Sequence, residues 1–465
     1  MTPQLTAAGT LLPGFEGTSL PVWLRERLAA GLGGVCLFAT NIGSPQQLRR
    51  LTDEIRAANP NAIVAIDEEG GDVTRLFQSV GSPYPGAAIL GRLDDLALTR
   101  QVAERVGRQL RAVGVTLDFA PDADINSSDD NPVIGTRSFG ASAELVARHT
   151  AAWVEGLQST GVAASAKHFP GHGDTATDSH LDLPVVDLPL DALRTRELAP
   201  FAAAIAAGTA TIMTSHILLP ELDDRPATFS SRILGELLRG ELGFEGVIVS
   251  DALDMRGASG VTGIPDAAVR ALAAGCDLLC IGTGNTDEQL GEIETAIAAA
   301  LSDGRLDPAR LADALARIAV LGAAGAVPSD PDGVPSYDLA RTVSAFDVTL
   351  GVEAPRGGIL VQLDTVANIA VGPAPWGAAA AGARVLHLGE GDELPVAGPL
   401  VIIGRDNHRR EWTRATIDAA RSRDARTLVV DMGWPSADRA YADVATFGAS
   451  RHVGEALLLW LGVSS

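Results

Sequence analysis

Short apolar runs that are typical of β-strands alternate with Ala- and Leu-rich helical stretches up to about Leu321. Most of these runs are continuously apolar, as expected of strands that are covered on both faces. Their ranges are 9–15, 34–39, 62–68, 115–121, 163–169, 210–216, 246–252 and 276–282. Between two of them, residues 44–58 space their apolar side chains as a helix does, and Ser44 is the expected N-cap. Because a (β/α)8 barrel requires eight such strands, the pattern predicts an α/β protein that begins with this barrel.

A second, smaller domain is expected after the barrel. Residues 326–340 are rich in Pro, Asp and Gly, which is typical of a linker. Beyond the linker, further apolar runs alternate with helical stretches such as 411–423, and the runs are 357–364, 383–389, 398–404 and 425–433. The pattern therefore predicts a catalytic barrel over 1–325, a linker over 326–340 and a smaller α/β sandwich domain with a parallel sheet over 341–465.

Polar side chains gather where the barrel runs end. Five ends carry titratable or paired polar groups, namely Asp67 and Glu68, Asp122 and Asp124, Lys167 and His168, Ser215 and His216, and Ser250 and Asp251. One or two polar strand ends would be ordinary. Five favour a funnel of convergent side chains, because a parallel barrel builds its active site at the carboxyl ends of its strands.

Composition mainly excludes partners. The formal net charge is -22, with 58 Asp and Glu against 36 Lys and Arg, which argues against nucleic acid or an anionic membrane as partner. No apolar run reaches the roughly 20 residues of a membrane span, and no secretory leader is evident, so the expected location is cytoplasmic. Three cysteines, Cys36, Cys276 and Cys280, have apolar neighbours and are expected to be buried free thiols.

The segment KHFPGHGDTATDSH, residues 167–180, holds the densest cluster of candidate chemistry. Asp178 can bind one ring nitrogen of His180 and raise the basicity of the other, which makes His180 a candidate general acid/base. Lys167 and His168 end a strand and suit the binding of hydroxyl or carbonyl groups. Two alternatives stay open. One is a turn-rich loop with incidental histidines, and the other is a metal site built from His168, His172, Asp174 and His180.

Asp251 ends a strongly apolar strand, where a carboxylate is positioned to act as a nucleophile or as the partner of a developing cation. The alternative is that Ser250 or Asp251 caps the next helix. Asp254 is expected to lie inside that helix.

Arginines complete the candidate site. Arg75 follows Asp67 in AIDEEGGDVTRLF, and Arg137 lies in GTRSFG. Arginine makes planar contacts with several donors to hydroxyl and carbonyl groups, although either residue alone is more often a surface residue. In the second domain, GRDNHRREW (404–412) follows a strand, and its arginines and His408 form either a binding loop or, more plainly, a solvated loop.

These segments together resemble a known family. KHFPGHGDTATDSH is followed by SDALDM and preceded by DEEGGDVTRL and GTRSF, in the order and spacing of the family 3 glycoside hydrolases. The resemblance is to their bacterial β-N-acetylhexosaminidase branch, which removes N-acetylglucosamine during cell-wall recycling. It covers about residues 5–325, and the second domain resembles the extra α/β domain of the two-domain members.

The resemblance implies a role for each candidate residue. Asp251 would be the nucleophile, and His180 the general acid/base oriented by Asp178. The sugar would be held by Asp67, Arg75, Arg137, Lys167 and His168. The family uses no metal and no cofactor, so none is expected here. Glu69 and Asp72 depart from what many members carry, which puts only the local electrostatics in doubt.

The implied activity is that of a retaining exo-β-N-acetylglucosaminidase acting on muropeptide or chitin-derived oligosaccharides, with a small carbohydrate as its partner. A neutral imidazole does not repel an anion, whereas a carboxylate would by about 4 kcal/mol at 4 Å. Inorganic phosphate could therefore replace water, which makes a phosphorylase the main alternative. A metal-dependent barrel hydrolase and a non-catalytic sugar-binding protein are the remote ones.

Overall fold

The computed structural model describes residues 6–175, 183–260, 262–322, 336–353, 357–365, 367–395 and 398–463. The chain divides into two compact units. Unit 1 contains Met1–Glu68, Leu96–Ile125 and Ser142–Asp332, and unit 2 contains Glu69–Asp95, Asn126–Ala141 and Gly333–Ser465. Two loops from the first third of the chain, 69–95 and 126–141, thus belong to unit 2. The boundaries expected at 325 and 340 stay a prediction.

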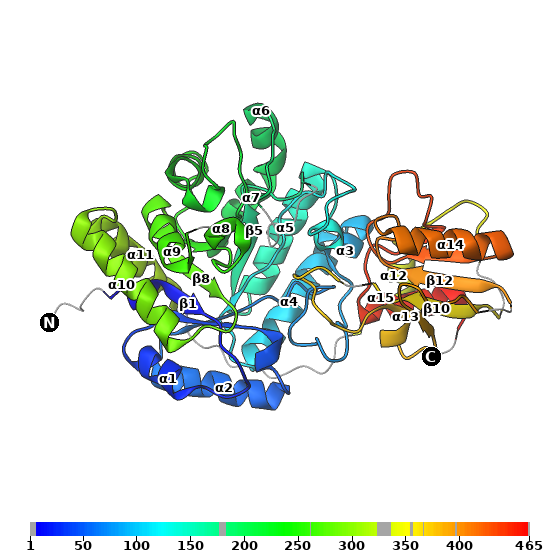
Figure 1. Cartoon of the computed structure of the whole chain (residues 1–465), viewed down its shortest axis with the longest axis horizontal. Coiled ribbons are helices and arrows are strands. Elements are labelled where there is room, and N and C mark those ends of the chain that lie inside the picture. Colours follow the sequence, from blue (N-terminus) through cyan, green and yellow to red (C-terminus); the bar gives the residue numbers. More distant parts are fainter. Residues whose placement is uncertain are drawn as a thin grey trace. The chain divides into compact units, whose positions relative to one another are not determined.

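Unit 1 is built on a parallel sheet of eight strands within the described residues. The strands are β1 (Leu11–Pro13), β2 (Gly34–Leu37), β3 (Ile63–Ile66), β4 (Leu117–Asp118), β5 (Ala163–Phe169), β6 (Thr211–Thr214), β7 (Val247–Ser250) and β8 (Leu278–Gly282). Their order is β1-β8-β7-β6-β5-β4-β3-β2, and the two end strands contact each other, so the barrel is nearly closed (Figure 1). Each of the eight apolar runs contains one strand, and the predicted barrel is confirmed.

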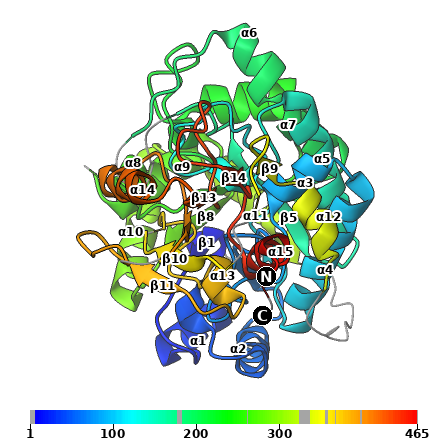
Figure 2. The ribbon, with the colours of Figure 1, turned by 90° about the vertical axis from the view of Figure 1, so that its right-hand side faces the viewer.

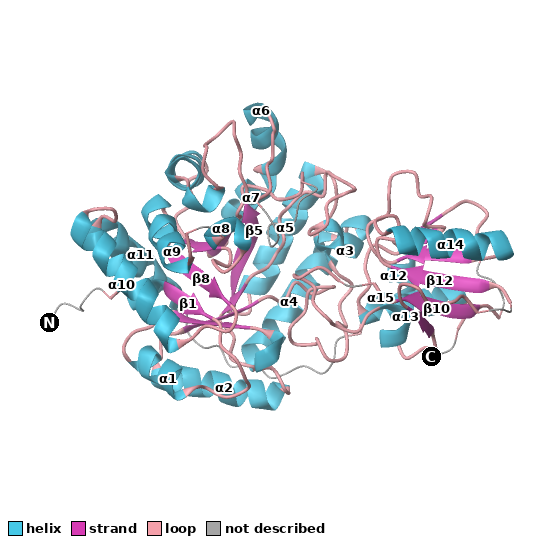
Figure 3. Cartoon of the chain, viewed as in Figure 1, coloured by secondary structure: helices cyan, strands magenta, loops and turns pink. Residues whose placement is uncertain are grey.

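Helices lie outside this barrel, as Figure 3 shows. They are α1 (Val22–Ala29), α2 (Pro45–Ala58), α4 (Leu96–Ala112), α5 (Ala143–Gln158), α6 (Leu190–Ala192), α7 (Ala199–Ala206), α8 (Arg256–Ser259), α9 (Ile264–Ala274), α10 (Asp287–Asp303) and α11 (Pro308–Gly322). Segments with 3-10 or π-helical geometry are η1 (Ala7–Thr10), η2 (Ala39–Asn41), η4 (Leu193–Glu197), η5 (Ala227–Phe229) and η6 (Arg232–Glu241). Helix α2 begins as predicted, because the Ser44 hydroxyl accepts the Gln47 N–H at 3.2 Å.

Apolar side chains from successive strands form one core cluster of unit 1. It includes Leu12, Ala65, Leu117, Met213, Val249 and both Cys36 and Cys280. All three cysteines of the chain are buried and free, as expected. None of the described helices is long and apolar enough to cross a membrane.

Unit 2 contains the second sheet, in the order β11-β10-β12-β13-β14-β9. Its strands are β9 (Asp347–Val348), β10 (Ile359–Leu363), β11 (Leu386–Leu388), β12 (Leu400–Gly404), β13 (Leu428–Asp431) and β14 (Val444–Ala445). All neighbours are parallel except β14 and β9 at one edge. The four apolar runs became β10 to β13, which confirms the parallel α/β domain. The strands β14 and β9 have two residues each, too few to show a pattern.

Helices cover both faces of this second sheet, and they are α3 (Ala87–Leu93), α12 (Leu339–Ser344), α13 (Gly377–Ala380), α14 (Glu411–Arg423) and α15 (Arg451–Leu461). Unit 2 also contains the 3-10 segment η3 (Gly135–Arg137). Figure 2 shows β10 and β13 between α14 on one side and α12 and α15 on the other. Successive strand residues point to opposite faces. Leu360 and Val401 therefore join the core cluster of α12, α13 and α15, while Val361 and Ile402 join that of α14.

Asp277 connects three elements of unit 1 just before β8. Its side chain is fully buried, and Oδ2 accepts hydrogen bonds from Arg239 at 2.6 Å and from the Ile248 N–H at 2.8 Å. Arg310 of α11 pairs with the other oxygen.

We expect Asp277→Ala to lower the free energy of unfolding by about 3 kcal/mol, because two largely buried guanidinium groups lose their carboxylate. Urea denaturation measures this. Asp303→Ala, at an exposed ion pair, is the control and should change the midpoint little; equal effects of the two variants would contradict the prediction.

Candidate active site

Two residues expected to bind the sugar form an ion pair in unit 1. Asp67 follows β3, and Lys167 lies in the carboxyl-terminal half of β5. Lys167 Nζ lies 2.8 Å from Asp67 Oδ1, and the lysine side chain is only 3% exposed while that of Asp67 is 19% exposed. The barrel therefore brings together two side chains that are 100 residues apart in sequence. An ammonium buried to this extent keeps its charge only beside such a partner.

Two fully buried carboxyl groups accompany this pair. Glu68 comes directly after Asp67, and its backbone N–H donates to Asp118 Oδ1 at 2.9 Å. Burial raises the pKa of the Asp118 carboxyl well above its ordinary value, although that hydrogen bond and the charge of Lys167 act in the opposite direction. Asp118 therefore favours its neutral form more than an exposed aspartate does.

Asp124 orients His168. The Nδ1 atom of His168 lies 2.7 Å from Asp124 Oδ2. Asp124 Oδ1 accepts the backbone N–H groups of His168 at 3.2 Å and of His172 at 2.7 Å. A carboxylate in this position fixes the imidazole orientation and places its proton on Nδ1. The sequence marks Asp124 as polar at a strand end but gives it no role, because its partner lies on a different strand.

The described part of the 167–180 segment packs closely onto unit 1. A Cβ on Gly173 would lie 1.6 Å from the Ile125 carbonyl oxygen, so only glycine fits there. Asp174 pairs with Arg196 at 2.5 Å. Burial lowers the pKa of His172 to about 4, so this ring is neutral near pH 7. The close approach at Gly173 and the ion pair of Asp174 hold the described part of the loop in place.

Asp178 and His180 lie outside the described residues, and their acid/base roles stay a prediction. The metal alternative also included His180. Among the described residues, one group of possible metal ligands lies within 4.8 Å, and it contains Asp122, Asp124 and His168. Both oxygens of Asp124 already accept hydrogen bonds from the protein. These hydrogen bonds explain why Asp124 and His168 lie close together. The expected lack of a metal stays a prediction.

Asp251 follows β7 in a turn that other residues hold in place. Its Oδ1 atom accepts the Ala252 N–H at 2.7 Å. His216, which follows β6, donates from Nε2 to the Ala252 carbonyl at 3.0 Å, and its Nδ1 atom contacts the Thr228 hydroxyl at 2.9 Å. The imidazole thus links the ends of two neighbouring strands. His216 was noted in the sequence only as a polar strand end, and it now has a structural reason to be there.

Asp254 does not lie inside the next helix, so that expectation was wrong. Helix α8 begins at Arg256 because Met255 is extended, and neither Ser250 nor Asp251 caps it. Asp254 lies in the preceding turn, and its Oδ2 atom accepts the Thr283 N–H at 3.0 Å. The approach is possible because Gly282 has no Cβ, which would lie 2.0 Å from the carboxylate.

Arg137 is held by Glu69 in unit 2. The Nε and Nη2 atoms of Arg137 donate to the two Glu69 oxygens at 2.9 and 2.8 Å, and the side chains are 4% and 6% exposed. Its Nη1 atom donates to the Val133 carbonyl at 3.2 Å. A bidentate pair fixes the plane of a guanidinium as well as its charge. Glu69, one of the departures from the family pattern, is therefore the residue that positions Arg137.

Asp72, the other departure, also ties unit 2 together. Its Oδ2 atom accepts the Thr136 hydroxyl at 2.9 Å, and its Oδ1 atom accepts the Ala449 N–H at 2.8 Å. Arg75 Nη2 donates to the Ala370 carbonyl at 2.9 Å. The loop 69–95 is thus anchored to both 126–141 and the α/β domain. The predicted contacts of Arg75 and Arg137 with a sugar stay a prediction.

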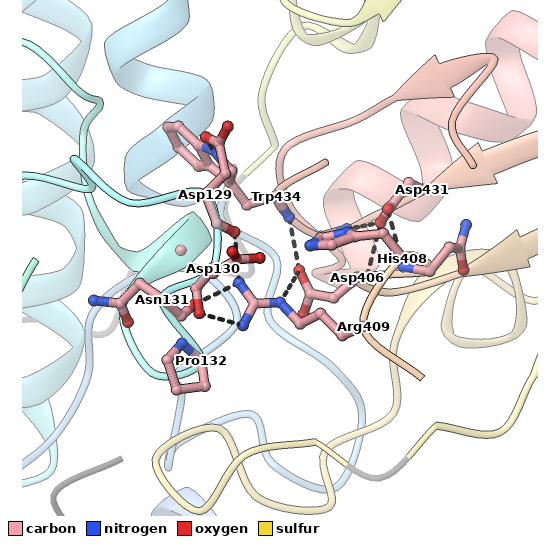
Figure 4. A network of polar contacts seen from close by, with 12 residues as sticks. Asp129, Asp130, Asn131, Pro132, Asp406, His408, Arg409, Asp431 and Trp434 are labelled. Atoms are coloured by element: carbon pink, nitrogen blue, oxygen red, sulfur yellow. Dashed lines mark hydrogen bonds and ion pairs between the residues drawn. The ribbon is translucent and has the colours of Figure 1, made fainter. Parts of the chain in front are cut away.

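Arg409 fixes the loop 126–141, which contains Arg137, and Figure 4 shows its guanidinium pointing toward Asp130 and Asn131. Its guanidinium donates at 2.7–2.9 Å to the backbone carbonyls of Asp129, Asp130 and Asn131. Trp434 Nε1 donates to the Asp129 carboxylate at 3.1 Å. The segment 404–412 is therefore not simply a solvated loop, because Arg409 is used to hold another loop of the same unit.

This arrangement defines a parallel-barrel enzyme whose polar groups follow the carboxyl ends of the strands. The model of the glycosyl hydrolase family 3 N terminal domain matches residues 24–321. The chain therefore belongs to glycosyl hydrolase family 3.

Relatives and solved structures agree with the family. The beta-hexosaminidase of Stenotrophomonas maltophilia (strain K279a) is 39% identical over 279 residues, which are 58% of this chain and 82% of the relative. Beta-hexosaminidase A of Pseudoalteromonas piscicida is 36% identical over 332 residues, 65% of this chain but only 55% of the relative. A family 3 beta-N-acetylglucosaminidase from Paenibacillus sp. str. FPU-7 superposes with a TM-score of 0.87 at 29% identity, covering 100% of this chain and 97% of the other. The assignment to an enzyme of the β-N-acetylhexosaminidase branch is confirmed.

Glu197, which the sequence did not single out, makes stability depend on pH. Its side chain is 1% exposed, Arg196 Nε donates to it at 2.5 Å, and burial raises its pKa from 4.5 to about 7. Between these values the unfolded chain loses the proton while the folded chain keeps it, so folding becomes less stable as pH rises through this window.

We expect Glu197→Gln to remove this dependence. Relative to the variant, the parent should lose up to about 3 kcal/mol of unfolding free energy as the pH rises from 4.5 to 8. Denaturation at a series of pH values measures it, with Glu241→Gln at an exposed ion pair as the control. A difference that is constant with pH would exclude Glu197 as the titrating group.

The Arg137–Glu69 pair gives a second test of the site. Glu69→Ala should lower the free energy of unfolding by about 3 kcal/mol, because it leaves a buried guanidinium without its carboxylate. Adding Arg137→Met should restore part of the loss, because the uncompensated charge is then removed as well. Denaturation of both single variants and the double variant measures the coupling, and strictly additive losses would show that the pair does not act as a unit.

Proposed function

We propose that this chain is a retaining exo-β-N-acetylglucosaminidase that releases terminal N-acetylglucosamine. The observation that carries the proposal is the placement of Asp251 at the carboxyl end of β7, in the same barrel that pairs Asp67 with Lys167 and orients His168. The identity of the terminal sugar is inferred from the names of the similar proteins. Peptidoglycan-derived muropeptides or chitin fragments, handled in the cytoplasm, are the substrates that the family resemblance favours.

The reaction proceeds in two displacements. The Asp251 carboxylate attacks the anomeric carbon, the glycosidic C–O bond breaks, and the leaving oxygen takes a proton from His180. Water then attacks the same carbon while His180 takes its proton, and the bond to Asp251 breaks. Two inversions give overall retention. One oxygen of the Asp251 carboxylate accepts the Ala252 N–H, and a hydrogen bond to the charged form favours the ionised state that a nucleophile needs.

The other residues bind the sugar in this proposal. Lys167 offers an ammonium beside the Asp67 carboxylate, so a sugar hydroxyl can accept from the first and donate to the second. His168, with its Nδ1 proton held by Asp124, presents Nε2 as an acceptor in its neutral form. Arg75 and Arg137 are assigned to the sugar by the family resemblance. Asp178 has the task of orienting His180.

The nucleophile is tested by chemical rescue. Asp251→Gly should lower kcat on a chromogenic N-acetylglucosaminide by at least about 10³-fold, because the first displacement loses its nucleophile. Azide should restore turnover and yield the α-glycosyl azide, since a small anion then makes a single inversion. Asp266→Asn, at an exposed ion pair of α9, is the control. Activity within about tenfold of the parent, or a β-azide product, would remove Asp251 from this role.

The same assay separates hydrolysis from phosphorolysis. Hydrolysis predicts a rate and a yield of free N-acetylglucosamine that do not change with inorganic phosphate. A rate that rises with phosphate, together with N-acetylglucosamine 1-phosphate as product, would instead identify a phosphorylase.

A further inference from the structure

The second sheet has a point at which its strand order reverses. After β10 the chain forms β11 on one side of that strand, and it then forms β12 on the other side. In open parallel α/β sheets, ligands bind beyond the carboxyl ends of the strands at such a point. Asp364 directly follows β10 here, and Arg405 directly follows β12.

A cavity lies at the carboxyl ends of these strands of the unit 2 sheet. Its volume is about 650 Å³, within the range of small-molecule sites. It is lined from β10, β11 and the segments that follow β10 and β12. The polar and aromatic lining residues are Gln362, Asp364, Asn368, Trp376, His387 and Arg405. Thr365, Gly372 and the side chains of several alanines, two prolines and one isoleucine form the rest of the wall, so much of the wall is apolar.

Arg405 is a buried cation in this cavity, and it forms no ion pair among the described residues. The residue is 8% exposed, and its guanidinium carbon lies 4.3 Å from the centre of the Trp376 ring. Its Nε atom is buried and makes no hydrogen bond within the described part of the chain. Burial lowers the pKa of the Arg405 guanidinium, with the charges of Asp72 and Asp406 acting in the opposite direction. An anion that accepts hydrogen bonds from a buried guanidinium stabilises its charged form.

The rim of the cavity has different chemistry. Asp364 and His387 form a pair with Oδ1 and Nδ1 2.8 Å apart, and their side chains are 49% and 51% exposed. A half-exposed carboxylate paired with imidazole offers both an acceptor and a donor to hydroxyl groups. The cavity thus combines a buried cation, apolar walls and a polar rim.

We propose that this cavity, whose lining residues all belong to unit 2, is a binding site for a small organic anion that carries hydroxyl groups, such as a sugar acid or a sugar phosphate. Arg405 holds the carboxylate or phosphate, and the Asp364–His387 pair contacts the hydroxyls. Trp376 fixes the guanidinium from one face, which leaves its N–H edge to the ligand. The site belongs to the α/β domain and does not depend on the reaction proposed for the barrel.

Calorimetric titration of the full chain tests the site. The probes are gluconate, glucose 6-phosphate, neutral glucose and inorganic phosphate, each added in the presence of excess N-acetylglucosamine to occupy the proposed catalytic site. We expect at least one of the two sugar anions to bind with a Kd below about 1 mM and neutral glucose to bind at least about tenfold more weakly. Arg405→Gln should weaken the binding of that anion at least about tenfold.

Two further variants keep the test decisive. Arg426→Gln changes an exposed arginine that precedes β13, at the amino ends of the strands of the same sheet, and should leave binding unchanged. Ala379→Leu narrows the cavity but keeps Arg405, so it should also weaken binding, and it replaces Arg405→Gln if that variant fails to fold. The lack of binding by both sugar anions, or binding that Arg405→Gln and Ala379→Leu leave intact, overturns the site. Equal affinity for inorganic phosphate and glucose 6-phosphate overturns the role of the rim.

Discussion

The parallel direction of the barrel strands is the constraint on which the chemistry of unit 1 depends. Because every strand runs the same way, every carboxyl end reaches the same rim, and residues far apart in sequence become neighbours. Asp67 and Lys167 meet across that rim, and so do His168 and Asp124. The backbone of the barrel is fixed by its apolar core, so these polar groups keep their distances without help from a ligand.

Buried charge then sets a second condition on the same residues. An ion taken out of water must find a partner or change its protonation state. Lys167 finds Asp67, and Arg137 finds both oxygens of Glu69, while Glu197 responds by a raised pKa. Each response has a different consequence. Paired groups keep a full charge, whereas a raised pKa makes the free energy of unfolding depend on pH.

The sequence predicts the strands well because continuous apolar runs are the direct mark of a buried parallel sheet. It predicts the polar strand ends for the same reason, but it does not predict what each side chain contacts. Asp124 and Glu69 show why, since their partners lie on other strands or loops and leave no periodic signal. Asp254 was misplaced because helix α8 starts later than its composition suggests, after the extended residue Met255. The family resemblance added roles, not contacts.

Two arginines of unit 2 show that their contacts distinguish a residue that holds a loop from a residue that can bind a ligand. Arg409 and Arg405 come from the same short segment after β12, and the sequence gives no reason to treat them differently. Arg409 uses its guanidinium on three backbone carbonyls, so its hydrogen-bonding capacity serves the loop that carries Arg137. Arg405 is more deeply buried, and its guanidinium lies over the Trp376 ring but forms no ion pair among the described residues. A buried guanidinium costs free energy unless its N–H groups are used, and at the reversal point of a parallel sheet a bound anion is the partner that the geometry accommodates.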